Sequence, residues 1–310
     1  MQHYDLSNKL FETFLDKEYM MYSSAVFNTI LTPNNLIFDP QDSLEEAQVR
    51  KIDMLLSRLE PISTNDSLLD IGAGWGGICI RAAQKYGCKV KGITLSVEQL
   101  NFAQDRVKAL GLDHLIALEL VDYRQFVANC TDDGIKFDRI VSCEMIEAVG
   151  HNCLGSYFAA IETLLHPQGI FVMQAVNMPD SRYQTCIQST NFINAIIFPG
   201  LCCHSLSVLL EAMTKHSTLF MDTCTNWNLH YAETLRRWRY NFNNTHATNP
   251  FLYPSLGFDE HFMRLWNLYL CCCEAGFEKQ VLNLQVLTFT RPANENLRVH
   301  RHHDKKQKLN

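Results

Sequence analysis

A glycine-rich stretch at residues 68–77 has the residue types that bring a ligand close to the backbone. It reads Leu-Leu-Asp-Ile-Gly-Ala-Gly-Trp-Gly-Gly, and a helical pattern follows from Ile78 to Tyr86. Glycine has no Cβ, so the chain can turn sharply and approach a ligand. The first N–H groups of the next helix are free to bind an anion. The stretch therefore predicts the first βα turn of a doubly wound nucleotide-binding fold.

The spacing within this loop indicates which ligand to expect. It is GxGxGG rather than the dinucleotide pattern GxGxxG, and Asp70 stands shortly before the first glycine. This arrangement resembles the S-adenosylmethionine (SAM) loop of class I methyltransferases, which implies that Asp70 helps to hold the amino group of SAM. An ordinary glycine-rich βα turn stays open as the alternative at this point.

The rest of the chain predicts a parallel sheet around this loop. Apolar stretches that read as strands end at residues 70–72 or lie near 88–93, 116–121, 137–143 and 169–176, with helical patterns between them. Strands that alternate with helices favour an α/β fold with helices on both faces of the sheet. Ligands of such sheets bind at the carboxyl ends of the strands. The segments that follow these strands should therefore converge on one site.

The flanking regions are expected to complete this core. Short amphipathic helices, one capped by Asp5 or Ser7 and one over residues 44–59, precede the first strand, and apolar residues crowd 192–198 and 206–213. Residues 279–290 alternate as a strand of a closing antiparallel pair does. We divide the chain into an N-terminal helical segment that packs over the cofactor (1–60), an α/β core (61–178), a helical cap or substrate insertion (179–270), a closing helix end with antiparallel strands (271–293) and a basic, disordered tail (294–310).

Composition narrows the classes of function. The 310 residues are 47% apolar and carry a net charge of −6, which argues against nucleic acid as a partner. The 12 cysteines show no zinc-site spacing, so we expect no metal and reduced thiols in a cytoplasmic compartment. A transmembrane helix is not expected. The basic residues of the tail, from Arg298 to Lys308, are either solvated or contact anionic lipid headgroups.

Motifs along nearly the whole chain resemble the cyclopropane-fatty-acyl-phospholipid synthase family, which includes the mycolic acid cyclopropane synthases. The branch with eukaryotic members is the most similar. The matching motifs, in chain order, are Tyr4-Asp5-Leu6-Ser7-Asn8, Met21-Tyr22-Ser23, Leu44-Glu45-Glu46-Ala47-Gln48, the glycine loop, Gly92-Ile93-Thr94-Leu95-Ser96, Asp122-Tyr123-Arg124, Phe137 to Ser142, Phe198-Pro199-Gly200, His230-Tyr231-Ala232 and Cys273-Glu274-Ala275-Gly276-Phe277.

This resemblance implies a Rossmann-like class I SAM-dependent methyltransferase fold with a helical cap over an acyl channel. It also implies transfer of the SAM methyl group to the cis double bond of an unsaturated phospholipid acyl chain, followed by proton loss to a bound bicarbonate and closure of a cyclopropane. An alkene is a weak nucleophile, so the reactants must be aligned in a dry pocket. The implied SAM-binding residues are Tyr22, Ser23, Asp70, Gly72, Ala73, Gly74, Trp75, Gly76, Thr94, Leu95, Ser96, Gln99, Asp122 and Tyr123.

The resemblance also implies a cage for the bicarbonate. Glu147, Tyr231 and Cys273 would form it together with the backbone at Glu144. Glu147 would orient the anion or receive its proton, and Tyr231 would offer a hydroxyl to the anion and a ring face to the carbocation. The alternatives without a catalytic role are a helix-start carboxylate, a core tyrosine and an inert buried thiol, respectively.

Several positions depart from the family pattern. Ser24 stands where the family has a cage cysteine, and Gln174 replaces a cage histidine. Ala148, Leu201 and His204 also differ from the family residues. An amide cannot become charged as an imidazole can, so Gln174 weakens the assignment of bicarbonate. We list Ser24 and Gln174 as catalytic candidates with Glu144, Glu147, Tyr231 and Cys273.

The sequence thus predicts a methyltransferase that forms a cyclopropane on phospholipid acyl chains. The alternatives are methyl or methylene branching of oleoyl chains, a small-amine N-methyltransferase similar to coclaurine N-methyltransferase, and an inactive lipid or SAM binder. We expect a cytoplasmic protein that contacts the membrane surface transiently, and a homodimer stays open.

Overall fold

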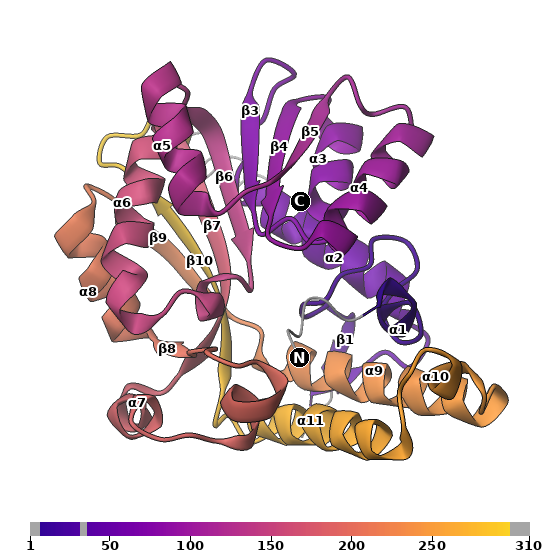
Figure 1. The fold of residues 1–310 in the computed structure, drawn as a ribbon. Helices are drawn as coiled ribbons and strands as arrows, with labels where there is room; N and C mark the ends of the chain where they lie inside the picture. Colours follow the sequence, from indigo (N-terminus) through magenta and orange to yellow (C-terminus); the bar gives the residue numbers. More distant parts are fainter. Residues whose placement is uncertain (1–6, 32–35, 298–310) are drawn as a thin grey trace.

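The computed structural model describes residues 7–31 and 36–297. Its centre is a sheet in which the strand order is β5-β4-β3-β6-β7-β10-β9, and β8 pairs with β7 (Figure 1). The parallel strands are β3 (Ser67–Ile71), β4 (Lys89–Thr94), β5 (Ile116–Leu120), β6 (Phe137–Cys143), β7 (Leu165–Met178) and β8 (His204–Ser205). The chain order reverses between β3 and β6, which is where such sheets bind their ligands. The predicted α/β class is confirmed.

Side chains of successive residues pack on opposite faces of the sheet. Leu68 of β3 belongs to the core with α2 and α3, and its neighbour Leu69 belongs to the core with α5, α6 and α8. A strand with both faces buried needs apolar residues at every position, which explains the continuous apolar stretches in the sequence. The helices on the two faces are α2 (Leu44–Ser57), α3 (Gly77–Tyr86), α4 (Val97–Ala109), α5 (Tyr123–Asp133), α6 (Leu154–Leu164) and α8 (Leu206–His216).

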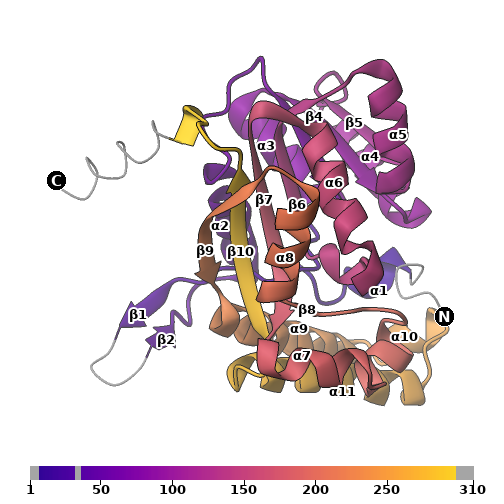
Figure 2. The same cartoon turned by 90° about the vertical axis from the view of Figure 1, so that its left-hand side faces the viewer.

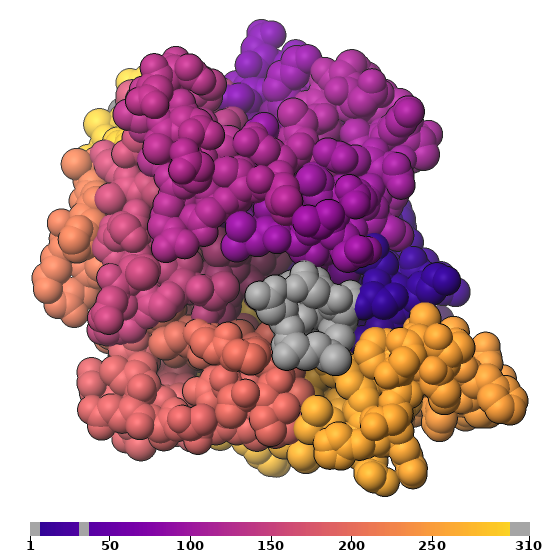
Figure 3. All heavy atoms as spheres, in the orientation of Figure 1, coloured from indigo at the N-terminus to yellow at the C-terminus, as the bar shows by residue number. Residues whose placement is uncertain are grey.

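A second group of helices lies beneath the carboxyl ends of the strands (Figures 1 and 2). Figure 3 shows this group as a block below the magenta and purple surface of the sheet domain. Its elements are α7 (Asp180–Ile187), the π-helical turn η4 (Ile193–Ile197), α9 (Asn228–Thr248), α10 (Leu252–Ser255) and α11 (Glu260–Glu278). Helices α9 and α11 pack together along their length. The apolar residues Leu209 and Met213 of α8, which we expected in the cap, face α6 and the sheet instead.

The antiparallel pair at the sheet edge differs from the expected one. Strand β10 (Asn283–Thr290) pairs with β7 and with β9 (Phe220–Asn226), which lies inside the segment that we expected to be helical. Polar residues dominate β9, so its own pattern is weak and its pairing with β10 defines it. Strand β10 starts later than residue 279, because α11 continues to Glu278 and Gln280 has a φ of 54°.

The N-terminal segment packs against both the sheet domain and the second group of helices. Ser7 caps α1 (Asn8–Phe11), as one of two alternatives proposed, while Asp5 lies outside the described residues. Strands β1 (Thr29–Leu31) and β2 (Leu36–Phe38) form a hairpin that projects from the body (Figure 2). Helix α2 begins with a capping box between Ser43 and Glu46 and ends at Ser57.

Two short 3₁₀ turns, η2 (Ile146–Ala148) and η3 (His151–Cys153), follow β6.

Among the helices of the described residues, none is both long and apolar enough to cross a lipid bilayer. The basic part of the tail, residues 298–308, lies outside the described residues.

Candidate active site

The glycine loop forms a sharp turn between β3 and α3. Gly72, Gly74 and Gly76 have φ values of 89°, 55° and 80°, a region that only glycine enters without strain. The N–H groups of Gly72 and Ala73 both donate to the carbonyl of Ile93, which fixes the loop to the end of β4. A Cβ added at Gly74 would meet no atom within 4 Å, so this part of the loop borders open space.

Asp70 has a free carboxylate oxygen at the base of this loop. It is buried, its Oδ2 accepts a hydrogen bond from the Cys79 thiol at 3.4 Å, and its Oδ1 has no partner among the described residues. Burial raises the pKa of Asp70 to about 7. An ammonium group placed here would satisfy the unpaired oxygen and favour the charged carboxylate. The amino group of SAM therefore fits this position.

The predicted residues after β4 form the start of α4. The Ser96 hydroxyl caps this helix by accepting from the Gln99 N–H at 3.3 Å. Thr94 Oγ1 donates to Gln99 Oε1 at 3.2 Å, so the two side chains lie together at the carboxyl end of β4. Leu95 points outward and is 73% exposed. The arrangement leaves Thr94 and Gln99 as the polar groups available to a ribose at this strand end.

Asp122 and Tyr123 follow β5, and the family resemblance implies that one of them meets the adenine of SAM. The Asp122 carboxylate caps α5 and accepts two hydrogen bonds from the Arg124 guanidinium, which hold the pKa of Asp122 below the usual range. The ring of Tyr123 meets the ring of Tyr157 edge-on at 5.5 Å. Asp122 therefore has a structural role of its own, and a contact of either residue with adenine stays a prediction.

The N-terminal segment covers the glycine loop. Trp75 Nε1 donates to Asn8 Oδ1 at 2.8 Å, and the Trp75 ring packs against Phe11 at 5.0 Å. Further along, the hydroxyls of Tyr22 and Tyr269 are 2.8 Å apart, which connects this segment to α11. Trp75 and Tyr22 thus fix the segment over the loop in addition to any contact with SAM.

Four predicted catalytic residues from separate parts of the chain meet at the end of β6, and we call them the Glu144 cluster (Ser24, Glu144, Gln174 and Tyr231). Oε1 of Glu144 accepts from the Ser24 N–H at 2.9 Å and from Gln174 Nε2 at 2.6 Å. Oε2 accepts from the Tyr231 hydroxyl at 2.6 Å. The resemblance implied a role for the backbone at Glu144, and in the structure the Glu144 carboxylate is also the centre of this cluster.

The backbone of Glu144 is also unusual. Its φ of 50° is left-handed, which is uncommon for a residue with a Cβ. Its N–H donates to the carbonyl of Gln174 at 2.8 Å, so backbone and side chain are both bonded to that residue. Glu144 as a residue is half-buried, and burial of its carboxyl group raises its pKa above the ordinary value. Strained residues held in this way concentrate at functional sites.

Glu147 lies close to the cluster and accepts fewer hydrogen bonds than Glu144 does. Its Oε1 accepts from the Val176 N–H, and its buried Oε2 has no hydrogen-bond partner in the described part of the chain. Burial, with the nearby charge of Glu144 as a second cause, raises the pKa of Glu147 to about 8. Glu147 is therefore mainly protonated at neutral pH.

Cys273 on α11 is placed less closely. Within residues 7–31 and 36–297, no hydrogen bond joins its thiol to the Glu144 cluster. Burial raises its pKa to about 12, so the thiol stays protonated. Cys203 lies near both Glu147 and Cys273, since both contribute to its raised pKa. The sequence analysis did not single out Cys203.

Lys51 is a second residue that the sequence analysis missed. Its side chain is 0% exposed on the inner face of α2, and its Nζ donates to Ser23 Oγ at 2.8 Å. Its positive charge lowers the pKa values of both Asp70 and Glu144, against the larger effect of burial. The signal was available, because Lys51 shares a helical face with the apolar Leu44, Ala47 and Leu55.

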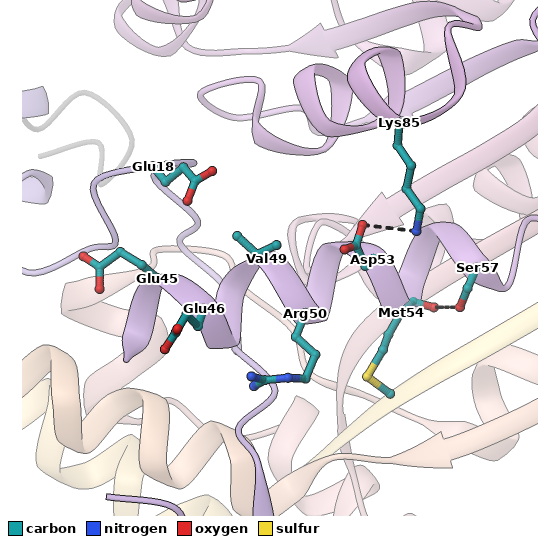
Figure 4. Close-up of a pocket in the computed structure, with 9 residues that line it drawn as sticks. All are labelled: Glu18, Glu45, Glu46, Val49, Arg50, Asp53, Met54, Ser57 and Lys85. Carbon is teal, nitrogen blue, oxygen red and sulfur yellow. Dashed lines mark hydrogen bonds and ion pairs between the residues drawn. The ribbon is translucent and has the colours of Figure 1, made fainter. Parts of the chain in front are cut away.

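A surface pocket on the opposite face of α2 is unrelated to this site (Figure 4). Its described lining contains none of the predicted site residues, and α2 separates it from Lys51 and Ser23. The lining residues are Glu18, Glu45, Glu46, Val49, Arg50, Asp53, Met54, Ser57 and Lys85.

Comparisons with known proteins agree with this architecture. The tuberculostearic acid methyltransferase UfaA1 of Mycobacterium tuberculosis is 40% identical over 289 residues, which are 93% of this chain and 64% of that protein. The cyclopropane-fatty-acyl-phospholipid synthase of Escherichia coli K12 is 33% identical over 300 residues, which are 97% of this chain and 69% of that protein. The chain thus spans about two thirds of the length of these relatives.

A solved structure and a family model extend the agreement. The mycolic acid cyclopropane synthase CmaA1, complexed with SAH and CTAB, is 27% identical, with a TM-score of 0.78 over 93% of this chain and 96% of that one. The family model described as mycolic acid cyclopropane synthetase matches residues 1–287. The chain has the class I SAM-dependent methyltransferase fold and belongs to the mycolic acid cyclopropane synthetase family.

Proposed function

We propose that this protein transfers the methyl group of SAM to the cis double bond of an unsaturated acyl chain in a phospholipid. The observation that carries the proposal is the Glu144 cluster. Its carboxylate and the Tyr231 hydroxyl lie at the end of β6, which is the strand next to β3 and its glycine loop. Membership of the family supports the same reaction class.

The residues around the cluster suit a reaction through a carbocation. When bound, SAM supplies an electrophilic methyl group on its sulfonium. The ring of Tyr231 packs on Phe277 at 4.4 Å and meets Trp238 edge-on, so an aromatic wall borders the carboxylate. Aromatic faces stabilise a nearby cation, and the buried side chains of Ser24 and Gln174 help to exclude water.

The SAM-binding part of the proposal uses residues at three strand ends. Asp70 would pair with the amino group of SAM, and Thr94 and Gln99 would bind its ribose. Asp122 and Tyr123 would border the adenine. The acyl chain would reach the site from the helices beneath the sheet, and residues 179–270 would form most of its cover.

The first product we propose is the cyclopropane. A methyl or methylene branch is the alternative, favoured by the 40% identity to a protein named tuberculostearic acid methyltransferase. A small-amine N-methyltransferase is the second alternative, because the negative charge of Glu144 would attract an ammonium substrate.

The test is an incubation with methyl-labelled SAM and vesicles of dioleoyl phosphatidylcholine and dioleoyl phosphatidylglycerol, followed by mass spectrometry of the released acyl chains. A gain of CH₂ without a remaining double bond supports the cyclopropane. The same mass with a reducible double bond indicates a methylene branch. Label in added amines but not in lipid would replace the proposal with N-methylation, and bound SAM without any transfer would identify an inactive binder. Flotation of the protein with these vesicles tests membrane contact.

A further inference from the structure

The hydrogen-bond donors expected to bind bicarbonate are already used within the protein. The resemblance implied a cage of Glu147, Tyr231, Cys273 and the backbone at Glu144, with Ser24 and Gln174 at two positions where the family has cage side chains. In the structure, the Ser24 N–H, the Gln174 amide and the Tyr231 hydroxyl all donate to the carboxylate of Glu144. Bicarbonate therefore does not fit this cluster, because the donors that would hold it have another acceptor.

The Glu144 carboxylate keeps room for one more proton donor. An ionised carboxylate has about four acceptor positions on its two oxygens. Oε1 of Glu144 uses two of them, for Ser24 and Gln174, and Oε2 uses one, for Tyr231. One position on Oε2 is left. Glu144 as a residue is half-buried, which is compatible with a substrate proton at this position.

Burial raises the pKa of both Glu144 and Glu147, and their hydrogen bonds decide which of the two more readily carries the negative charge. Glu144 accepts three hydrogen bonds, while the described contacts give Glu147 one and leave its Oε2 without a partner. Hydrogen bonds to a carboxylate favour its charged form. The charge of Lys51 adds to this preference at Glu144. Two neighbouring carboxyl groups titrate as a pair, and the three hydrogen bonds on Glu144 favour Glu147 as the group that keeps the proton.

We propose that the side chain of Glu144 is the base of the reaction and that it replaces bicarbonate. This inference rests on the proposed function. The alkene carbon bonds to the methyl carbon of SAM, the S–CH₃ bond breaks, and S-adenosylhomocysteine leaves with that electron pair. Oε2 of Glu144 then removes a proton from the new methyl group. The C–H electrons close the cyclopropane ring onto the cationic carbon, and the Glu144 carboxyl later returns the proton to solvent.

The same base accounts for the alternative product. If a hydride first shifts between the two former alkene carbons, the positive charge moves to the carbon that carries the methyl group. Loss of the methyl proton to Glu144 then forms a methylene branch, and no external oxidant or reductant is required. The identity of the base is therefore independent of which product forms.

The first experiment measures lipid methylation in buffer freed of carbon dioxide and bicarbonate. We expect the wild-type rate to be unchanged by removal or addition of bicarbonate. Glu144→Gln should reduce turnover by roughly 100-fold or more, the range for loss of a general base, while binding S-adenosylhomocysteine normally by calorimetry. Wild-type turnover that requires bicarbonate, or an E144Q variant at the wild-type rate, would overturn the proposal.

The second experiment opens the cluster to an external anion. Glu144→Gly removes the carboxylate at a position whose left-handed backbone suits glycine, and it frees the three donors. We expect this variant to bind ¹³C-bicarbonate, detected by NMR in the presence of S-adenosylhomocysteine, and to regain activity when bicarbonate is added. The wild type should show no such binding. Stoichiometric binding of ¹³C-bicarbonate to the wild type would contradict the proposal even if no lipid is methylated.

A further variant identifies which carboxyl group is the base, and another serves as its control. Glu147→Gln mimics the protonated form of Glu147 and should lose less activity than E144Q, while a larger loss would assign the base to Glu147. Glu211→Gln changes an exposed carboxylate on α8 that pairs with Lys215, and it should match the wild type. Failure of the wild type to label any lipid would reject the proposed function alone, since the binding experiment still decides the role of Glu144.

Discussion

The SAM loop and the Glu144 cluster lie at the carboxyl ends of neighbouring strands, β3 and β6, but they are built in different ways. The loop is one continuous stretch whose shape follows from its own glycines. The cluster joins the N-terminal segment, the ends of β6 and β7, and α9 through hydrogen bonds to one carboxylate. The shape of the loop is thus a local property, whereas the Glu144 cluster, which contains the proposed base, depends on the whole fold.

A substitution in the loop should therefore affect SAM binding, and one in the cluster should affect turnover. Asp70→Asn removes the carboxylate but keeps its shape. We expect SAM affinity to fall roughly 10- to 100-fold, since a hydrogen bond to a charged group contributes about 1.5–3 kcal/mol. Calorimetry with S-adenosylhomocysteine measures this, and an unchanged affinity would remove Asp70 from the cofactor site.

The same variant has a second, opposite effect on stability. Because the pKa of Asp70 is raised to about 7 from an ordinary value of 3.8, the folded protein binds its proton more tightly than the unfolded chain does. This stability is present below pH 4 and is lost as the pH rises through 7. The apo wild type should lose stability across this range relative to D70N in urea unfolding. Parallel pH profiles of the two proteins would contradict the assignment.

Tyr231→Phe changes the cluster and leaves the loop intact. Loss of its hydrogen bond to Glu144 removes about 1.5 kcal/mol, which corresponds to roughly a tenfold lower kcat. The KM for SAM should stay the same. A change in KM without a change in kcat would show that Tyr231 contributes to SAM binding rather than to turnover.

Replacement of Lys51 tests whether the glycine loop and the Glu144 cluster interact electrostatically. Lys51→Met should raise the pKa values of both Asp70 and Glu144, because the lysine charge lowers them. Activity that needs ionised Glu144 falls as pH decreases through its raised pKa, so the acid limb of the kcat profile should move to higher pH. Recovery of kcat in alkaline buffer separates this effect from simple damage to the fold, which would lower kcat at every pH.

The smallest effect on cofactor binding is expected in the N-terminal segment that covers the glycine loop. Asn8→Ala removes the acceptor of the Trp75 indole and costs about 1 kcal/mol, or roughly a fivefold change. S-adenosylhomocysteine should dissociate faster by that factor in stopped-flow measurements. A dissociation rate equal to that of the wild type would mean that the Asn8–Trp75 hydrogen bond does not slow release of the cofactor.

Sequence reasoning succeeded where the signal is local. The glycine loop and β6 (Phe137–Cys143) follow from residues adjacent in the chain, and the structure has them where they were expected. It failed for β9, whose polar residues are ordered by pairing with β10. It also failed for the Glu144 side chain, because no local pattern indicates that a left-handed residue turns its carboxylate toward donors from three distant segments.

The left-handed backbone at Glu144 has a consequence for how such sites can change in evolution. Glycine is the residue that fits this conformation without strain, and glycine codons GGA and GGG differ from the glutamate codons GAA and GAG in the middle base only. Under our proposal, a single nucleotide change at this position would separate an enzyme that binds bicarbonate as its base from one that carries the base in its own chain. Such a change would free an enzyme from the local supply of carbon dioxide while the rest of its site stays as it was.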